Sequence, residues 1–476
     1  MRYLSAGQLA RLVDVSPQAW PYYRALADAM REAVMGGQIP VRVRMPAERH
    51  LAQTLGVSRT TVTAAYDVLR ERGFLESRRG SGSWTALPDP AATADNPWLA
   101  VDGDGLIQLH AAAPPAPSAL RAAMLEAVDE APRYGMGNGY HPLGLPVLRE
   151  RIAARYTERG LATRPEQILV TTGSQQAIEI AFGVCVRPGD AVLVESPTYP
   201  HAVDSARRHG ARLVSVGVSA GGWHEDLVSS AMRQAGARLA YLMPDFQNPT
   251  GALMDDGTRA AVAAAARRAG TVLLVDETWS ELALEETPRT APMAAFGADG
   301  DVISIGSASK LWWGGLRIGW IRASAALARR MALHRASIDI ASPVLEQLVV
   351  AALFDRLAET AAERRRGLLL SRDTLAAALR ELLPAWEWTA PRGGGTLWIR
   401  LDSGSAVALA EAAACHGVRI APGPWFGLEG TLDGYLRLPF TQPPQVLREA
   451  VRRLERARRV GRTGAVRVPD ALSPMV

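Results

Sequence analysis

The chain has 476 residues, too many for one ordinary domain, and its 48% hydrophobic and 21% charged residues exclude a disordered polymer. It contains no run of about 18 apolar residues, and its N-terminus lacks the basic-then-apolar order of a secretory signal. We therefore expect a cytoplasmic protein with no membrane partner. Cys185 and Cys415 lie far apart, so we expect neither a disulfide nor a bound metal.

The positive charge of the chain is concentrated at its N-terminus. Residues 1–86 contain 12 Arg and 7 Asp or Glu, a surplus of five that equals the net charge of the whole chain. The remaining residues carry 41 basic and 41 acidic side chains and are neutral overall. A basic module on a neutral body is typical of nucleic-acid binding, although a small basic face is often only solvated.

Residues 21–86 have the pattern of a winged helix-turn-helix domain. Apolar residues at helical spacing predict a helix over 21–36, and a second short helix follows Pro46 and ends at Gly56. Ser58 is a good N-cap for a third helix. Two short strands, at 74–76 and 83–85, flank a glycine-rich tip and predict a wing. We expect the DNA-binding domain at 1–86 and a linker rich in Pro, Ala, Asp and Gly at 87–106.

The rest of the chain, residues 107–476, alternates short β-rich runs with helical stretches. Seven strands are predicted, at 167–172, 191–195, 212–216, 238–243, 271–276, 301–305 and 318–322. This alternation favours a large α/β domain around a mostly parallel sheet. A smaller α+β part is expected at about 346–460, with strands near 396–401 and 435–438.

Lysine is almost absent from this chain. Of its 53 basic residues, 52 are Arg, and the one lysine is Lys310. An arginine bias usually reflects codon composition, yet it removes lysine wherever arginine can serve. Schiff-base formation needs a primary amine that can lose its proton, which a guanidinium does not do. The count alone therefore predicts that Lys310 forms a Schiff base.

The segment 45–62, which reads MPAERHLAQTLGVSRTTV, resembles the winged-helix domain of GntR-type regulators. The resemblance implies a double-stranded DNA operator as partner, with Arg49 on phosphate or a base edge and Arg59 as the main reader of the major groove. It also implies contacts from the start of the recognition helix and from the wing, by Ser58, Thr60, Thr61 and Gly80. For Ser58, a purely capping role is an equal alternative.

Residues 108–456 resemble the fold-type I aminotransferases, whose motifs occur here in chain order. The resemblance implies pyridoxal 5'-phosphate as cofactor, with Lys310 as its Schiff-base residue. The matching motifs imply that Ser174, Gln175, Ser307 and Arg317 bind the phosphate, with Arg317 donating through its guanidinium fork. They also imply that Tyr199 stacks on the pyridine ring, that Asn248 bonds to its phenolate oxygen and that Asp276 faces its nitrogen.

Two further residues are assigned by the same resemblance. Tyr140 matches a tyrosine that reaches the phosphate of the neighbouring subunit, which implies a homodimer. Arg437, in the run Leu-Arg-Leu-Pro, matches the arginine that grips an amino-acid carboxylate. One position departs from the pattern: Trp279 stands where aminotransferases have a tyrosine, three residues after the aspartate. An indole donates through one N–H and cannot titrate, so Trp279 is either a donor or a packing residue.

A GntR-type reader joined to an aminotransferase-like domain is the plan of the MocR-type transcription regulators, so the fold class is multidomain. Two functions remain open. In the first, a nucleoid-associated regulator senses pyridoxal phosphate, a small amino-compound effector, or both. In the second, a working aminotransferase also binds DNA. The domain fusion and Trp279 favour the regulator. A plain amino-acid enzyme does not fit the N-terminal motif and charge.

Overall fold

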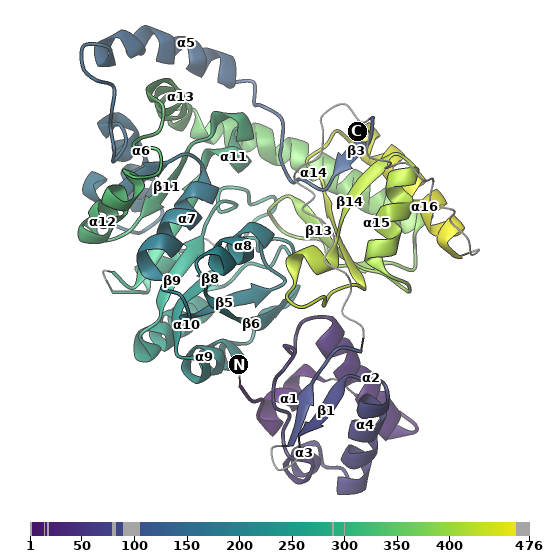
Figure 1. Ribbon diagram of the computed structural model, residues 1–476. Coiled ribbons are helices and arrows are strands. Elements are labelled where there is room, and N and C mark those ends of the chain that lie inside the picture. The colour runs from purple at the N-terminus through teal and green to yellow at the C-terminus, as the bar shows by residue number, and fades with distance from the viewer. Residues whose placement is uncertain are drawn as a thin grey trace, which may run out of the picture.

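The computed structural model describes residues 2–13, 15–16, 19–78, 82–88, 105–287, 290–298 and 300–462. Gly80 and most of the linker expected at 87–106 lie outside these ranges. Figure 1 shows a small N-terminal body beneath a much larger one.

The N-terminal body is the predicted winged helix-turn-helix. Its elements are α1 (Ala6–Leu12), α2 (Tyr22–Met35), α3 (Glu48–Leu55), α4 (Arg59–Glu71), β1 (Leu75–Arg78) and β2 (Gly82–Thr85). Helix α3 ends at Gly56, whose φ of 69° is left-handed and therefore suits glycine. Ser58 caps α4, and β1 and β2 form the antiparallel wing. Helix α1 was not predicted, because seven residues show too little periodicity; its capping box joins Ser5 and Gln8.

The large domain is built on an eight-stranded sheet in the order β4-β11-β10-β9-β8-β5-β6-β7. All seven predicted strands are present, and only β11 and the two-residue β7 run antiparallel to the others. The strands are β4 (Ile168–Thr171), β5 (Ala191–Ser196), β6 (Arg212–Ser219), β7 (Gly222–Trp223), β8 (Ala237–Leu242), β9 (Val272–Asp276), β10 (Val302–Ser307) and β11 (Gly319–Arg322).

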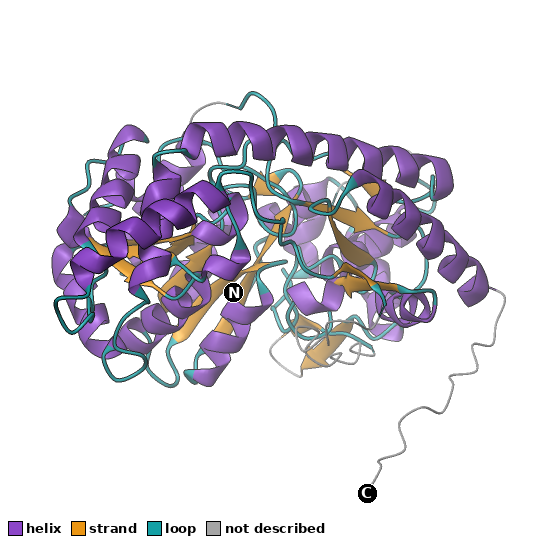
Figure 2. Cartoon of the chain, turned by 90° about the horizontal axis from the view of Figure 1, so that it is seen from above, coloured by secondary structure: helices purple, strands orange, loops and turns teal. Residues whose placement is uncertain are grey.

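Helices cover both faces of this sheet, as Figure 2 shows from above. They are α6 (Pro146–Glu158), α7 (Ser174–Cys185), α8 (Pro200–Arg208), α9 (Glu225–Ala235), α10 (Asp256–Ala269), α11 (Ala308–Leu311), α12 (Ala325–Arg335) and α13 (Val344–Phe354), while α5 (Leu120–Glu130) packs on α13 at the outside. The two faces form separate apolar clusters, because successive strand residues point to opposite sides: Leu193 belongs to one cluster, and Val192 and Val194 to the other.

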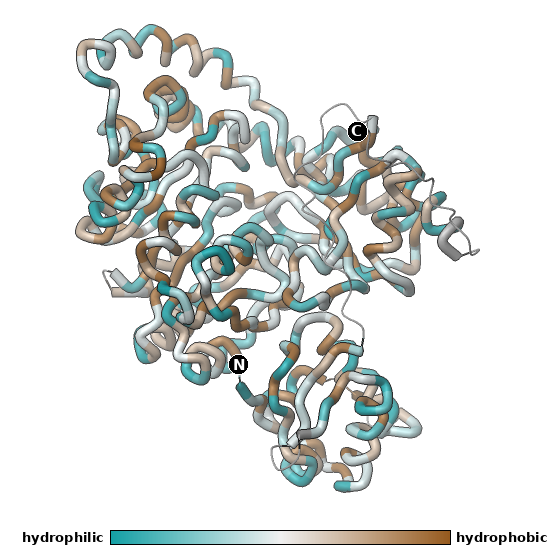
Figure 3. Tube along the Cα trace, viewed as in Figure 1, coloured by the Kyte–Doolittle hydropathy of each residue, from teal (hydrophilic) through white to brown (hydrophobic). Residues whose placement is uncertain are grey.

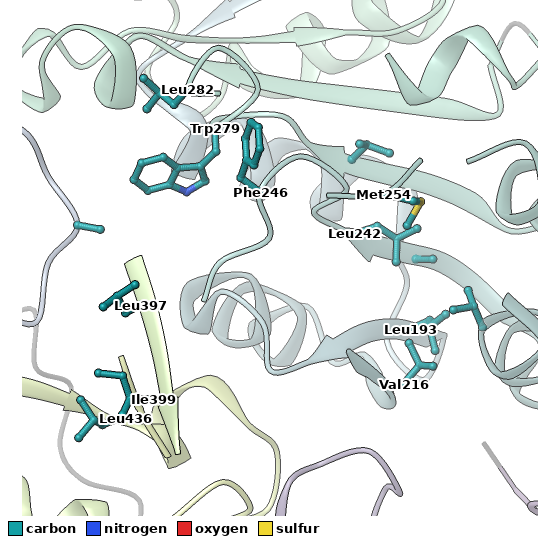
Figure 4. Close-up of a cluster of buried hydrophobic side chains, with 14 of the residues drawn as sticks. Leu193, Val216, Leu242, Phe246, Met254, Trp279, Leu282, Leu397, Ile399 and Leu436 are labelled. Carbon is teal, nitrogen blue, oxygen red and sulfur yellow. The ribbon is translucent and has the colours of Figure 1, made fainter. Parts of the chain in front are cut away.

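A smaller sheet in the order β12-β13-β15-β14-β3 forms the second part of this body. Its strands are β12 (Glu387–Trp388), β13 (Thr396–Arg400), β14 (Val418–Pro422), β15 (Tyr435–Pro439) and β3 (Ile107–Leu109), and its helices are α14 (Leu357–Leu382), α15 (Ala406–Cys415) and α16 (Pro444–Arg462). Figure 4 shows Leu397, Ile399 and Leu436 projecting from this sheet. Strand β3 pairs in parallel with β14, so three residues that precede the large domain complete the small sheet.

The DNA-binding domain is docked on the large domain through its N-terminal segment. The backbone N–H groups of Arg2 and Tyr3 donate to Gln234 Oε1 at 2.9 and 3.1 Å. Gln8 Nε2 donates to Ser230 Oγ at 3.0 Å. Ser230 and Gln234 both lie in α9. These hydrogen bonds therefore hold the first helix of the DNA-binding domain against α9.

The same domain also touches the small domain. Leu432 N donates to Met35 O at 2.8 Å, and Arg42 Nη1 lies 3.4 Å from Glu429 Oε1. The DNA-binding domain therefore contacts both the large and the small domain. No helix in the described ranges is long and apolar enough to cross a membrane.

The loop after β8 is held by a fully buried arginine of α10. The Arg259 side chain is 0% exposed and donates to Met254 O at 2.9 Å, Ala291 O at 3.1 Å and Asp245 Oδ1 at 2.8 Å. This loop carries Asn248, so the ion pair inside the domain supports a predicted site residue.

Replacement of Arg259 by Met should destabilise the protein strongly, because Asp245 would stay buried without its charge partner. Breaking such a pair from one side costs about 3–5 kcal/mol. The free energy of unfolding in urea measures the loss. Arg267→Met is the matched control on the same helix: it breaks an exposed pair with Asp301 and should cost at most about 1 kcal/mol. Equal losses in the two variants would contradict a structural role for the Arg259–Asp245 pair.

Candidate cofactor site and DNA interface

The candidate cofactor site lies at the carboxyl edge of the large sheet. Strands β4, β5, β8, β9 and β10 run in the same direction, so the segments that follow them meet at one edge. These segments carry the predicted residues of the large domain, which are Ser174, Gln175, Tyr199, Asn248, Asp276, Ser307, Lys310 and Arg317. Arg437 reaches the same place from β15 of the small domain.

Lys310 is half-buried and places its amine in this site. Its Nζ donates to Ala112 O at 2.8 Å and lies 5.0 Å from the centre of the Trp279 ring. Burial, together with the nearby positive charge of Arg437, lowers the pKa of Lys310 to about 8, while Asp276 opposes the shift. A larger fraction of this lysine is therefore neutral and nucleophilic at physiological pH than in an exposed lysine.

Asp276 ends β9 and accepts two hydrogen bonds. Tyr241 Oη donates to its Oδ2 at 2.7 Å, and Thr278 N donates to its Oδ1 at 3.0 Å. Burial raises the pKa of Asp276, while these bonds and the charge of Lys310 lower it. A protonated ring nitrogen would give this buried carboxylate the positive partner that burial demands. Tyr241 was not predicted; its one signal is a phenol within an apolar strand.

The segment around the start of α7 forms a cradle for an anion. Gly173 precedes the helix with φ 81°, and a Cβ on it would lie 2.5 Å from Arg317 Nη2. A Cβ on Gly319 would lie 2.6 Å from Ser174 N. These glycines therefore bring backbone N–H groups and a guanidinium together at the N-terminus of a 12-residue helix, an arrangement that suits a phosphate group. The residues present fit pyridoxal phosphate.

Arg437 is a buried guanidinium with an incomplete set of partners. It is 2% exposed, donates to Asn248 Oδ1 at 3.2 Å and to His110 O, and lies 4.7 Å from the centre of the Phe426 ring. Its Nε has no hydrogen-bond partner among the described residues. Burial lowers the pKa of Arg437 to about 10. A buried guanidinium that no carboxylate of the described chain pairs with is suited to a ligand carboxylate.

The two aromatic residues of the site differ in their surroundings. Tyr199 precedes α8, and burial together with the charge of Asp276 raises the pKa of its phenol. Trp279 is 4% exposed and packs on Gly395, where a Cβ would lie 2.6 Å from the indole. Figure 4 shows this indole beside Phe246. Trp279 thus both packs the core and faces the Lys310 amine. Tyr140 differs from all these residues, since it lies on a loop and is 59% exposed.

The candidate DNA interface is the exposed start of α4 together with α3. The Arg59 side chain is 72% exposed, and Arg49 and Thr60 are also exposed. Ser58 Oγ accepts a hydrogen bond from Thr61 N at 3.1 Å and lies 2.7 Å from Thr60 Oγ1. Ser58 is therefore the helix cap that the sequence predicts, and its hydroxyl stays exposed at the same surface.

Glu48 organises this surface, although it was not predicted from the sequence. Thr63 Oγ1 donates to Glu48 Oε2 at 2.8 Å, and the same carboxylate lies 3.7 Å from Arg59 Nε and 3.5 Å from Arg70 Nη2. The hydroxyl of Thr63 is thus used within the protein. Glu48 is the acidic residue of the segment MPAERHLA, and its carboxylate helps to orient the Arg59 side chain at the Nε atom.

Two family models match the chain in separate ranges. The model for bacterial regulatory proteins of the gntR family matches residues 22–84, and that for aminotransferase class I and II matches residues 106–454. The chain is 28% identical over 428 residues to the HTH-type transcriptional regulator YisV of Bacillus subtilis, covering 83% of this chain and 86% of that protein. It is 32% identical over 326 residues to the probable rhizopine catabolism regulatory protein MocR of Rhizobium meliloti, covering 63% and 65%.

A solved structure agrees with these matches. LysN, the alpha-aminoadipate aminotransferase of Thermus thermophilus, complexed with N-(5'-phosphopyridoxyl)-L-leucine, has a TM-score of 0.69 and 28% identity, covering 75% of this chain and 93% of LysN. The aminotransferase-like domain therefore has the fold of a pyridoxal-phosphate enzyme and is preceded by a DNA-binding domain. The chain belongs to the aminotransferase class I and II family and is a transcription regulator of the MocR type, with a GntR-type winged helix-turn-helix.

Proposed function

We propose that this regulator holds pyridoxal phosphate at Lys310 and that a small amino compound controls its affinity for an operator through that site. The observation that carries the proposal is the position of the Lys310 amine, which donates to Ala112 O at 2.8 Å, lies 5.0 Å from the centre of the Trp279 ring and is within reach of the charges of Asp276 and Arg437. Pyridoxal phosphate supplies an aldehyde that condenses reversibly with primary amines and a ring that withdraws electrons.

Each predicted residue has a role in holding that group. Asp276, oriented by Tyr241, would hold a proton at the ring nitrogen. Tyr199 would stack on the ring, and Asn248 would donate to its phenolate oxygen. The phosphate is held by the hydroxyl of Ser307, the guanidinium of Arg317 and the amides at the start of α7, from Ser174 and Gln175.

Arg437 connects an effector to the DNA-binding domain. An amino compound with a carboxylate would complete the partners of Arg437, which lies on β15 of the small domain. The same domain carries Leu432, which is hydrogen-bonded to Met35 at the end of α2. An effector that draws the small domain toward the large one therefore acts on a contact of the reader. A ligand shifts such an equilibrium by its differential affinity for the two arrangements.

We further propose a homodimer whose interface includes α5. Helix α5 lies at the outside of the molecule, and Figure 3 shows hydrophobic residues recurring along it. Met124, Leu125 and Val128 are 41%, 59% and 57% exposed. Contiguous exposed apolar surface of this kind marks association sites. The exposed Tyr140 is then available to the phosphate of the second subunit, and a dimer presents two readers to a two-fold operator.

An active aminotransferase that also binds DNA is the second candidate. The aminotransferase fold favours it, and Trp279 argues against it. Proton movement on the substrate needs a finely tuned set of groups, and the indole beside Lys310 brings no hydroxyl that could bond to the cofactor or titrate.

The first prediction concerns Lys310. Protein incubated with pyridoxal phosphate should acquire visible absorbance, and borohydride should fix the cofactor to the peptide that contains Lys310. Because the pKa of this lysine is lowered from 10.5 to about 8, the attachment rate should rise with pH through a midpoint near 8. Lys310→Ala and Lys310→Arg should abolish attachment without unfolding the protein. The same reducible absorbance in either variant would refute the assignment.

The second prediction concerns the reader. Arg59→Ala should weaken binding to operator relative to random DNA, since loss of a bidentate base contact costs about 1–3 kcal/mol. Arg49→Ala should weaken both more evenly and reduce the salt dependence, if Arg49 contacts phosphate. Fluorescence anisotropy with both DNAs measures this. An unchanged operator preference in Arg59→Ala rules out Arg59 as a base reader.

The third prediction separates the two candidate functions. Amino acids and amines are screened for a spectral shift, and each hit is assayed for operator affinity and keto-acid production. We expect a compound that changes spectrum and operator affinity without turnover. Arg437→Gln should remove the response to a carboxylate-bearing effector while leaving spectral shifts by simple amines. Rapid transamination with unchanged operator affinity would favour the enzyme.

A further inference from the structure

A second cavity, of about 290 Å³, lies where the DNA-binding domain meets both parts of the aminotransferase-like body. The reader contributes Arg2, Trp84 and residues 37 and 40–42 to its wall. The large domain contributes Ser196 and residues 212–215 at the start of β6, and the small domain contributes residues 428, 429 and 431. None of the residues predicted to hold pyridoxal phosphate lines this cavity.

The cavity is strongly positive. Three arginines, Arg2, Arg42 and Arg212, line it against a single carboxylate, that of Glu429, so its charged side chains sum to +2. The Glu429 carboxylate pairs with Arg42 at 3.4 Å, and Arg212 Nη2 donates to the carbonyl of Ala235 at 3.2 Å. Positive charge that converges on a hollow between low-dielectric walls focuses its field on an anion.

The rest of the wall suits a small organic molecule. The hydroxyl-bearing Ser196, Ser215 and Thr431 are buried, and the apolar surface comes from residues 40, 41, 213, 214 and 428 and from the Trp84 indole. Ligand sites of this mixed kind have volumes of roughly 300–1,000 Å³. At about 290 Å³ the cavity lies at the small end of that range, which suits a compact metabolite.

The backbone at the cavity is strained on both sides. Arg42 has φ 62° and Glu429 has φ 58°, which are left-handed values for residues that are not glycine. Such conformations cost energy, and they cluster at ligand sites and switch regions. The two strained residues face each other across the junction of the reader with the small domain.

We propose that this cavity binds a small organic dianion, either a phosphate monoester or a dicarboxylate, which fastens the DNA-binding domain to both parts of the body. The dianion would complete the charge of Arg2, Arg42 and Arg212. Because its wall comes from three bodies, it binds tightly only when all three are docked, and it therefore biases the orientation of the reader. This ligand is distinct from the cofactor and from the amino compound proposed above.

The test is a calorimetric titration of the full chain with phenyl phosphate, with succinate and with the monoanion benzoate. At least one dianion should bind saturably, and benzoate should bind about tenfold more weakly or worse, since charge-assisted bonds are lost. The dianion with the lower Kd shows whether the cavity prefers a phosphate monoester or a dicarboxylate. The proposal is overturned if neither dianion binds saturably.

Matched variants locate the bound dianion. Arg212→Gln and Arg42→Gln, at exposed side chains, should each weaken binding about tenfold. Arg207→Gln, an equal charge change at an exposed position of α8 outside the cavity, should leave it unchanged. Arg317→Gln tests the cofactor cradle: binding that is lost in Arg317→Gln and kept in Arg212→Gln would overturn the proposal.

Hydrogen exchange gives a second readout. At a dianion concentration close to the Kd of the parent protein, the dianion should protect residues 36–42 and 428–431 in the parent and protect them much less in Arg212→Gln. Protection confined to the start of α7 would contradict the proposal. Lys310→Ala should bind the dianion with unchanged affinity, so failure of the cofactor assignment and failure of this one are distinguishable.

Discussion

The half-buried Lys310, with its amine inside the site, is the constraint on which the rest of the site depends. Removing a charged lysine from water costs free energy. Here a second cation, the buried guanidinium of Arg437, acts on the same amine and disfavours its charged form further. The Asp276 carboxylate, held by Tyr241, is the opposing charge in the same pocket. Pyridoxal phosphate would bring an aldehyde and a phosphate to this pocket, and an amino compound would bring a carboxylate to Arg437. The charge balance of the pocket is therefore the main support for the two ligands that we propose.

The second feature is mechanical. The reader is not merely tethered by a linker, because α1 and the first residues are bonded to the region of α9, while the end of α2 is bonded to the loop before β15. Arg437 lies on that same strand. The proposed carboxylate-binding residue and a contact of the DNA-binding domain thus lie in the same small domain. The cavity at this junction has its own charge and its own strained residues, so a second ligand has a place to act on the same contact.

Much of the fold and part of the candidate site could be predicted from local sequence. The long strands, the recognition helix and its Ser58 cap follow from hydrophobic period and capping chemistry, and Lys310 follows from its being the single lysine. Features that depend on long-range contacts could not. Strand β3 is three residues long and exists only because β14 lies beside it. The bond from Tyr241 to Asp276 and the network of Glu48 with Thr63 join residues whose spacing carries no motif.

The central claim is that operator affinity is controlled through exchange at the Lys310 amine. The most direct measurement compares operator binding before and after borohydride reduction of the cofactor-loaded protein, each with and without the amino compound found by screening. Reduction makes the link to Lys310 permanent and leaves the reader untouched. The account predicts that the reduced protein still binds operator but no longer responds to the compound. An equal response before and after reduction would contradict it.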